Sequence, residues 1–358
     1  MRNFYLRLVK NGPDSFFCWV VFVGLWPFSC LYGLIVRLRL LAFSLGLKKT
    51  YYASVPVISV GNLTVGGTGK TPMADFLAKW MVQHDVPTAI VSRGYGGNYS
   101  AAVARVEPKS KTAMTPAECG DEPFLLAKRN PTVPVFVARR RTLGVKAAEK
   151  AGAKLIILDD GFQHRAVHRD LDIVLLDSLK PFGNGHIVPA GQLREPQSAL
   201  ERSHLLVMTR VQPGAGSLSP GDGNVIKASK PTLRSRHLMS QNLTSLSGDI
   251  VSWDELAGKK CVAFAGIARP DAFFAALKDR NLTLSDEISF VDHQVYDTEL
   301  LERLFLMSRG CDALVTTEKD AVKLAKAEFP VPCYQVGVDL EFEDVSLLDH
   351  LLQGLTAN

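Results

Sequence analysis

The segment Val55–Pro72, with the sequence VPVISVGNLTVGGTGKTP, constrains the fold of this chain more than any other. Its apolar first half predicts a buried strand, and a glycine-rich turn then leads to Lys70 and Thr71, which open a stretch with apolar residues at helical spacing. This order is typical of a phosphate-binding P-loop, in which backbone N–H groups and the lysine face the phosphates and the hydroxyl binds Mg²⁺. The predicted nucleotide site comprises Thr64, Val65, Gly66, Gly67, Thr68, Gly69, Lys70 and Thr71.

One position departs from the strict P-loop pattern, because Thr64 stands where that pattern has a glycine. Taken alone, GGTGKT is also compatible with a chance match or a plain glycine turn. The apolar strand before it and the amphipathic helix after it favour nucleotide binding. We therefore expect the chain to bind a nucleoside triphosphate.

The composition describes a folded chain that is long enough for two domains. Of 358 residues, 47% are hydrophobic and 22% are charged. The net charge is only +5 and the basic residues form no stripe, so we expect no nucleic-acid partner. Six scattered cysteines without a CxxC pair indicate reduced thiols of a cytoplasmic protein rather than disulfides or zinc ligands.

A long apolar run lies near the N-terminus. Phe16–Val36 spans 21 residues without a formal charge, which is enough to cross a bilayer, and basic residues flank it on both sides. Its length and the lack of a small-residue cleavage site argue against a signal peptide, and a buried core helix is the other alternative. Basic residues on both sides do not show which end of the helix faces the cytoplasm. A helix that spans the bilayer and a helix that lies in the cytoplasmic leaflet are therefore both compatible with the sequence. We expect attachment to membrane lipid.

Apolar runs and helical stretches alternate after the P-loop, beginning with a predicted strand at Thr88–Ser92. This alternation predicts an α/β fold of the P-loop NTPase type, with a parallel sheet covered on both faces. The Gly/Pro/Ser-rich segment Gln212–Asn224 is interpreted as a linker, and a second, smaller strand–helix series follows it. The expected divisions are an N-terminal membrane-associated segment at 1–50, a P-loop domain at 51–211, a second α/β lobe at 212–340 and a C-terminal helix at 341–358.

Polar residues follow several predicted strands, at the sheet edge where parallel sheets bind ligands. In KLIILDDGFQHR an apolar strand ends at Asp159 and Asp160, as in a Walker B element whose carboxylate holds Mg²⁺. A helix cap or a turn after the strand is the alternative. Gln163 and His164 stand at the same rim.

Two further motifs precede this strand. In CGDEP, Asp121 and Glu122 stand where a helix begins, so they are either capping residues or a general base and a carboxylate near the metal. In SRGYGG, Arg93 and Tyr95 are placed to meet a phosphate and a sugar, and a plain turn is the alternative.

The remaining motifs lie further along the chain. In LREP, Arg194 and Glu195 fall in a glycine-rich loop. His293 has Asp292 as a neighbour, although an isolated histidine is more often structural than catalytic. The sequence TTEKD at 316–320 fits a capped helix N-terminus better than a site.

Together these segments resemble one family, tetraacyldisaccharide 4′-kinase, the lipid A pathway enzyme of Gram-negative bacteria. The resemblance spans nearly the whole chain and includes the apolar N-terminal helix. Its P-loop has the same off-pattern glycine spacing. The eight segments that carry the resemblance are GNLTVGGTGKTP, SRGYGG, GDEP, LDDGFQHR, PAGQLREP, FAGIARP, DHQVY and TTEKDAVKL.

The resemblance implies a reaction, its cofactors and its location. The reaction is transfer of the γ-phosphate of ATP, with Mg²⁺, to the 4′-hydroxyl of a tetraacyldisaccharide 1-phosphate lipid A precursor, forming lipid IVA. It takes place at the inner membrane, with the catalytic domain on the cytoplasmic side. The implied partners are the lipid precursor and inner-membrane lipid, and no obligate protein partner is evident.

The resemblance also assigns roles to residues. The catalytic aspartate maps onto Asp121 and its partner histidine onto His293, which are expected to come from different lobes and to meet by hinge closure. Residues expected at the metal are Thr71, Glu122, Asp159, Asp160 and Glu195. Residues expected to bind substrate are Arg93, Tyr95, Gln163, His164 and Arg194.

Two other functions are compatible with a P-loop. A membrane-tethered switch ATPase of the MinD/ParA type shares the GG-x-GKT loop. That group carries a lysine where Val65 stands and places its membrane helix at the C-terminal end. Another small-molecule kinase on the same scaffold is the second alternative. Transfer of phosphate to the lipid disaccharide, compared with futile ATP hydrolysis, discriminates among them.

Overall fold

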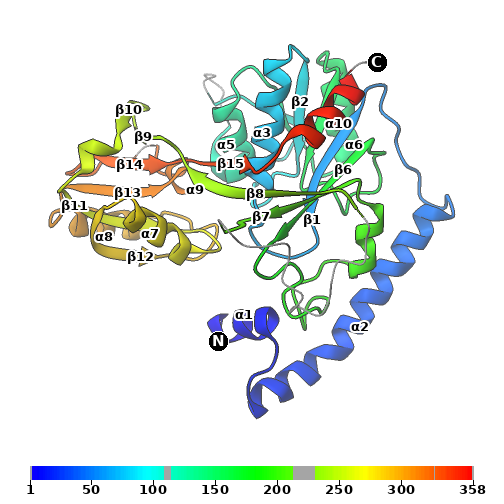
Figure 1. The fold of residues 1–358 in the computed structure, drawn as a ribbon, viewed down its shortest axis with the longest axis horizontal. Coiled ribbons are helices and arrows are strands. Elements are labelled where there is room, and N and C mark those ends of the chain that lie inside the picture. Colours follow the sequence, from blue (N-terminus) through cyan, green and yellow to red (C-terminus); the bar gives the residue numbers. More distant parts are fainter. Residues whose placement is uncertain (1, 109–113, 213–229, 326, 357–358) are drawn as a thin grey trace. The chain divides into compact units, whose positions relative to one another are not determined.

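The computed structural model describes residues 2–108, 114–212, 230–325 and 327–356 (Figure 1). The chain divides into two compact units. The first comprises Met1–Arg93, Arg140–His237 and Leu340–Asn358, and the second comprises Gly94–Arg139 and Leu238–Asp339. Residues 94–139 group with the second unit, whereas the sequence placed them in the P-loop domain. Apart from Gln212 itself, the expected linker lies outside the described residues.

The first unit is built on a sheet with the strand order β15-β8-β7-β6-β1-β5-β2. The pairs β2–β5, β5–β1, β1–β6, β6–β7 and β7–β8 are parallel. Every residue of β1, β2, β5 and β7 is buried, which explains why these strands form continuous apolar runs. The bounds are Val57–Asn62 (β1), Thr88–Ser92 (β2), Leu155–Asp159 (β5), Leu171–Asp177 (β6), Leu205–Thr209 (β7), Thr232–Met239 (β8) and Val338–Phe342 (β15).

Helices cover this sheet. α3 packs on β1, β2 and β5, and α6 packs on β2. Trp80 of α3 donates its indole N–H to Asp349 of α10 at 2.8 Å, which attaches the C-terminal helix to the unit. The bounds are Lys70–Gln83 (α3), Arg141–Lys150 (α6), Gln197–Arg202 (the short helix η1) and Ser346–Thr356 (α10). The α/β fold of the P-loop type with a parallel sheet is thus confirmed.

Two helices precede the sheet, α1 (Arg2–Asn11) and α2 (Phe16–Ser44). Among the described residues, α2 is the one helix that is long and apolar enough to cross a membrane, and only 17% of its most apolar window is buried. Its buried residues form one narrow stripe: Cys18, Phe22, Ser29 and Gly33. The exposed remainder argues against a buried core helix, because an apolar helix that packs inside a protein hides most of its surface.

The second unit contains a six-stranded sheet of order β10-β9-β14-β13-β11-β12 and an antiparallel pair, β3–β4. The strands β14, β13, β11 and β12 pair in parallel, and β9 and β10 are antiparallel. The strand bounds are Ala104–Val106 (β3), Val135–Val137 (β4), Asn242–Ser245 (β9), Ile250–Ser252 (β10), Lys260–Ala265 (β11), Thr283–Ser289 (β12), Ala313–Thr317 (β13) and Cys333–Val336 (β14). The helix bounds are Pro116–Cys119 (α4), Asp121–Arg129 (α5), Trp253–Leu256 (η2), Pro270–Asp279 (α7), Thr298–Ser308 (α8) and Glu318–Ala321 (α9).

A single residue, Gly337, separates β14 from β15. A side chain at Gly337 would come within 2.7 Å of Arg129 Nη2. A residue with a Cβ at this break would therefore displace the ends of the Arg129 and Glu318 side chains.

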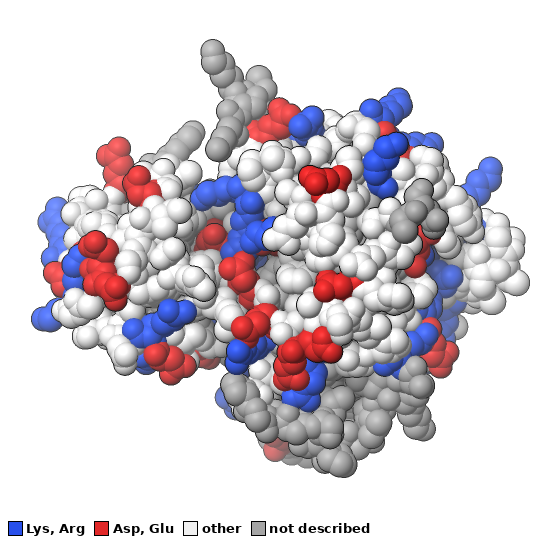
Figure 2. All heavy atoms as spheres, turned by 45° about the horizontal axis from the view of Figure 1, so that its top comes forward, with Lys and Arg blue, Asp and Glu red and all other residues white. Residues whose placement is uncertain are grey.

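Surface charges of both signs are interspersed on the face that Figure 2 shows. The first unit contains surface ion pairs, such as the 2.9 Å pair of Arg234 with Glu343. Such exposed pairs contribute little to stability, but the two opposite charges of each pair largely cancel one another.

Candidate active site

The P-loop connects β1 to α3 in the first unit. Gly66 and Gly69 have φ values of +125° and +95°, which glycine adopts without strain. A side chain at Gly69 would also lie 2.6 Å from His237 Nε2. The chain therefore needs glycine at the residue that precedes Lys70 and caps the helix.

The loop following residue 186 supports the start of the P-loop. Thr64 forms an isolated bridge with Leu193, and Val65 N–H donates to the carbonyl of Gln192 at 2.8 Å. Arg194 N–H donates to the carbonyl of Leu63 at 2.7 Å. These backbone contacts hold the PAGQLREP segment against the P-loop.

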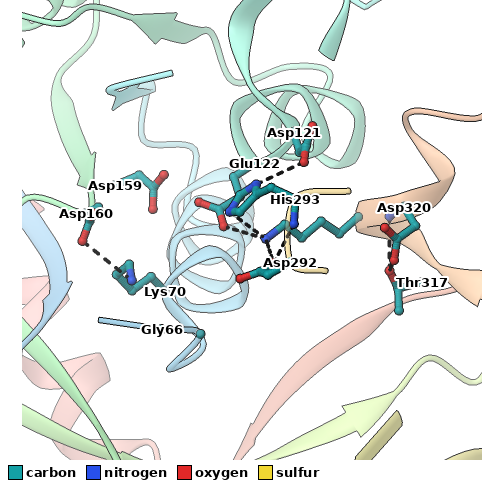
Figure 3. A network of polar contacts seen from close by, with 12 residues as sticks. Gly66, Lys70, Asp121, Glu122, Asp159, Asp160, Asp292, His293, Thr317 and Asp320 are labelled. Atoms are coloured by element: carbon teal, nitrogen blue, oxygen red, sulfur yellow. Dashed lines mark hydrogen bonds and ion pairs between the residues drawn. The ribbon is translucent and has the colours of Figure 1, made fainter. Parts of the chain in front are cut away.

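Lys70, Asp160 and Arg194 form a charged cluster at this sheet edge. Lys70 Nζ lies 3.7 Å from Asp160 Oδ1, and Arg194 Nη1 lies 2.9 Å from both carboxylate oxygens (Figure 3 shows the lysine contact). Burial by itself would raise the pKa of Asp160, but the Lys70 and Arg194 charges hold it below its usual value. Asp160 is therefore an anion, paired with two cationic side chains.

Asp159 lies deeper, at the end of β5, and is 1% exposed. The Ser92 hydroxyl donates to its Oδ2 at 2.9 Å, and Arg141 Nη2 donates to its backbone carbonyl at 3.3 Å. Ser92 ends β2, the strand beside β5. The end of β2 and the start of α6 thus hold Asp159 in place.

Gln163 and His164 lie at the same rim. Gln163 Nε2 donates to the Asn62 carbonyl at 2.8 Å, and Lys70 Nζ donates to the Asn62 side chain at 3.4 Å. Burial, reinforced by arginines such as Arg141, lowers the pKa of His164 to about 4, so this ring is neutral near pH 7. The sequence analysis missed Asn62, whose only signal was its place directly after the apolar strand.

Glu195 does not turn toward this cluster. It is 4% exposed, and its Oε2 accepts from Arg202 Nη2 at 2.6 Å. Arg202 in turn lies over the ring of Phe162 at 4.6 Å. The contacts of Glu195 are those of a buried ion pair.

The second unit holds the other predicted catalytic residues. Asp121 is the first residue of α5, and His293 lies between β12 and α8. The two side chains form a hydrogen bond of 3.2 Å between Asp121 Oδ2 and His293 Nδ1 (Figure 3). They belong to one compact unit, which differs from the expectation that they come from different lobes and meet by hinge closure.

Ion pairs explain why Asp121 groups with His293. Lys323 Nζ lies 3.5 Å from Asp121, and Arg129, at the other end of α5, pairs with Glu318 at 2.5 Å. Burial opposes ionisation of Asp121, but His293 and the two nearby lysines hold its pKa below the usual value. Asp121 is therefore a carboxylate ready to accept a hydrogen bond.

Lys319 is a member of this cluster that sequence reasoning missed. Its Nζ lies 3.3 Å from Glu122, 3.1 Å from Asp292 and 3.3 Å from His293 Nε2. The predicted helix cap is present as well, because the Thr317 hydroxyl accepts from the Asp320 N–H. The segment is thus both a helix start and part of the cluster, and the four-residue spacing of Lys319 and Lys323 was the available signal.

Tyr95 and Arg93 stand at the boundary of the two units in sequence. Tyr95, in the second unit, is 69% exposed, and its ring centre lies 5.8 Å from that of His293. Arg93 is exposed and belongs to the first unit. Among the described residues, no group of three or more His, Cys, Asp or Glu side chains is arranged as a complete metal site.

A parallel sheet with a P-loop after β1 and a carboxylate pair after β5 defines a P-loop nucleotide-dependent enzyme. The sequence matches the family Tetraacyldisaccharide-1-P 4′-kinase (LpxK) over residues 21–356. The chain belongs to this family.

Individual relatives agree with this assignment. The chain is 44% identical to a tetraacyldisaccharide 4′-kinase of Syntrophotalea carbinolica over 356 residues, which is 99% of this chain and 98% of the relative. It is 42% identical to one of Geobacter metallireducens over 83% of this chain and 86% of the relative. The crystal structure of the "apo" form of LpxK from Aquifex aeolicus in complex with ATP superposes with a TM-score of 0.78 at 32% identity, covering 94% of this chain and 99% of that one.

Proposed function

We propose that this chain transfers the γ-phosphate of ATP to the 4′-hydroxyl of a tetraacyldisaccharide 1-phosphate, a lipid A precursor. Its family membership and its P-loop edge support the proposal. The observation that carries it furthest is the hydrogen bond between Asp121 and His293. A kinase that acts on a sugar hydroxyl needs a proton acceptor, whereas a nucleotide-dependent switch needs no such pair.

Asp121 is proposed as the general base. Its lowered pKa keeps it ionised, so it accepts the proton of the 4′-hydroxyl while that oxygen bonds to the γ-phosphorus and ADP leaves. His293 orients the carboxylate through the 3.2 Å contact. Because phosphoryl transfer depends mainly on positioning and charge neutralisation, a carboxylate of low pKa suffices.

Thr71, Asp159 and Asp160 are proposed to hold Mg²⁺. Their oxygen donors suit this ion, which binds through one or two carboxylates together with phosphates and water, so a complete protein cage is not required. The ion would neutralise charge on the phosphate oxygens. The other two predicted ligands fit less well, since Glu122 pairs with Lys319 and Glu195 with Arg202.

The remaining polar residues are proposed to bind the acceptor. The positive charges of Arg93 and Arg194 would attract the phosphate of the disaccharide. Gln163 and the neutral His164 would form hydrogen bonds with it. The exposed Tyr95 ring beside His293 offers an apolar face to a sugar.

The proposed location is the inner membrane, with the catalytic units on the cytoplasmic side, where ATP is available. The exposed apolar surface of α2 supports membrane association. The acyl chains of the acceptor would then stay in the bilayer while its headgroup meets the enzyme.

A transfer assay tests the proposal. Purified protein in detergent micelles is given γ-labelled ATP and the purified lipid disaccharide, and the lipid fraction is separated and counted. We expect the label in the lipid. Release of labelled inorganic phosphate with none in the lipid would point to the switch ATPase, and transfer to a different small molecule alone would point to the other kinase.

A further inference from the structure

Arg210 directly follows β7 and has a φ of +60°. A bulky residue in this left-handed region is strained, and such strain persists mainly at functional positions. Among the described residues, four other non-glycine residues have a positive φ. Asp85 and Asn281 follow the ends of α3 and α7, where a left-handed residue is ordinary. The other two, Asp160 and His293, belong to the candidate active site.

The Arg210 guanidinium holds a carbonyl of the P-loop. Its Nη2 donates to the Gly67 carbonyl at 2.6 Å, and its Nη1 pairs with Asp177 Oδ2 at 2.5 Å. The preceding residue, Thr209, donates its hydroxyl to the Thr68 carbonyl at 3.0 Å. Asp177 and Thr209 are paired residues at the ends of the adjacent strands β6 and β7. The hydrogen bonds to the Gly67 and Thr68 carbonyls therefore come from the same end of these two strands.

These two contacts orient two N–H groups of the loop. The carbonyls of Gly67 and Thr68 belong to the peptide groups whose N–H groups are those of Thr68 and Gly69. In a trans peptide the C=O and N–H point in opposite directions. Fixing the carbonyls on Thr209 and Arg210 therefore directs both N–H groups to the opposite side, which in a P-loop is the side of the phosphates.

The backbone around Arg210 is held on both sides. The Ser178 hydroxyl donates to the Arg210 carbonyl at 2.9 Å, and the Val211 N–H donates to the Ser235 carbonyl at 3.0 Å. These hydrogen bonds offset the strain of the left-handed conformation and leave the side chain aimed at the P-loop.

We propose that Arg210 is a positioning residue for the nucleotide: by holding the Gly67 carbonyl, it presets the Thr68 N–H for the phosphates of ATP. The inference rests on the proposed ATP-dependent function. It adds a residue that lies outside the P-loop motif and acts through the loop backbone rather than on the reacting atoms.

The substitution Arg210→Gly tests this role without destabilising the backbone. Glycine adopts φ near +60° without strain, so the variant should fold with a thermal midpoint within a few degrees of wild type. We expect the Kd for a non-hydrolysable ATP analogue, measured by calorimetry, to rise about 10-fold or more, which corresponds to about 1.4 kcal/mol. The KM for ATP should rise in parallel, and the KM for the lipid acceptor should change less than about 2-fold.

Arg236→Met is the matched control. Arg236 lies on β8 and pairs with Glu341, so this variant also loses an arginine ion pair in the same sheet but leaves the P-loop untouched. Its Kd for the analogue should equal that of wild type. An unchanged Kd in Arg210→Gly would overturn the inference, and so would equal losses for nucleotide and lipid with a lowered thermal midpoint. If wild type binds the analogue but transfers no phosphate to the lipid, the proposed function fails while this inference is still decided by the Kd values.

Discussion

Nδ1 of His293 lies 3.2 Å from Oδ2 of Asp121, although 172 positions separate the two residues in sequence. Both belong to the second compact unit, and Lys319 lies 3.3 Å from the other ring nitrogen of His293. An ammonium group can only donate, so His293 Nε2 accepts from Lys319 and Nδ1 carries the proton that is donated to Asp121. The pair is therefore preset with the Asp121 carboxylate as hydrogen-bond acceptor and His293 Nδ1 as donor.

The first prediction concerns this pair. Asp121→Ala and His293→Ala should each lower the transfer rate by about 100-fold or more, the usual scale of general base catalysis. The double variant should lose little beyond the worse single variant, because residues that act as a unit are not additive. The rates are to be measured at saturating ATP with varied lipid acceptor.

Glu299→Gln provides the control for this experiment, because it removes an exposed carboxylate from α8 of the same unit and should leave the rate unchanged. If the losses of the two single variants multiply fully in the double variant, Asp121 and His293 act independently.

The second prediction concerns Lys70. Lys70→Ala removes the cation that faces Asp160 across 3.7 Å and that a P-loop presents to the β- and γ-phosphates. We expect transfer to be abolished in a protein that remains folded, as judged by circular dichroism. Lys79→Ala, on the exposed side of the same helix and paired with Asp75, should keep normal activity. Near-normal turnover of a folded Lys70→Ala protein would refute the nucleotide assignment.

The sequence predicted the buried sheet well. β2 has the expected bounds, Thr88–Ser92, because a strand that is covered on both faces is a continuous apolar run. β10 (Ile250–Ser252) was missed, since it has three residues that are exposed or half-buried. An edge strand of this kind is specified by its neighbour β9, which local periodicity does not reveal.

The grouping of residues 94–139 with the second unit was also beyond local sequence patterns. Arg129 reaches Glu318 and Asp339, which are about 200 positions away, and no spacing rule relates them. The motif residues of each unit stand at strand ends and beside glycines, which is why the sequence indicated them. Lys319 had only its four-residue spacing from Lys323 as a signal, and Arg210 had no local signal, because the contacts of both side chains exist only in the folded chain.

The third prediction concerns α2. Val20, Val23 and Leu31 are 55%, 57% and 55% exposed, whereas the buried stripe of Cys18, Phe22, Ser29 and Gly33 faces the rest of the unit. Lysine at all three exposed positions should move the protein from the membrane fraction toward the soluble one, because each lysine costs about 3 kcal/mol at the centre of a membrane helix. The distribution is measured by sedimentation and immunoblotting.

Leu306→Lys on α8 is the control for the lysine substitutions in α2. Leu306 is 62% exposed, like the substituted residues, but it lies in the second unit. It should sediment like wild type. If the triple variant also remains wholly in the membrane fraction, a surface other than α2 anchors the protein.

The last prediction concerns pH. Burial and nearby arginines lower the pKa of His164 from 6.5 to about 4, so between these values the unfolded chain binds a proton that the folded chain excludes. The free energy of unfolding therefore has its full value above about pH 6.5 and decreases as the pH drops toward 4. His164 accounts for up to about 1.4 kcal/mol of this decrease per pH unit. His164→Gln cannot take up this proton, so the thermal midpoint of the variant should fall less than that of wild type between pH 7 and pH 4. His168→Gln, which changes an exposed histidine four positions away, should follow the wild-type curve. Parallel curves for wild type and His164→Gln would show that His164 is not held neutral by its surroundings.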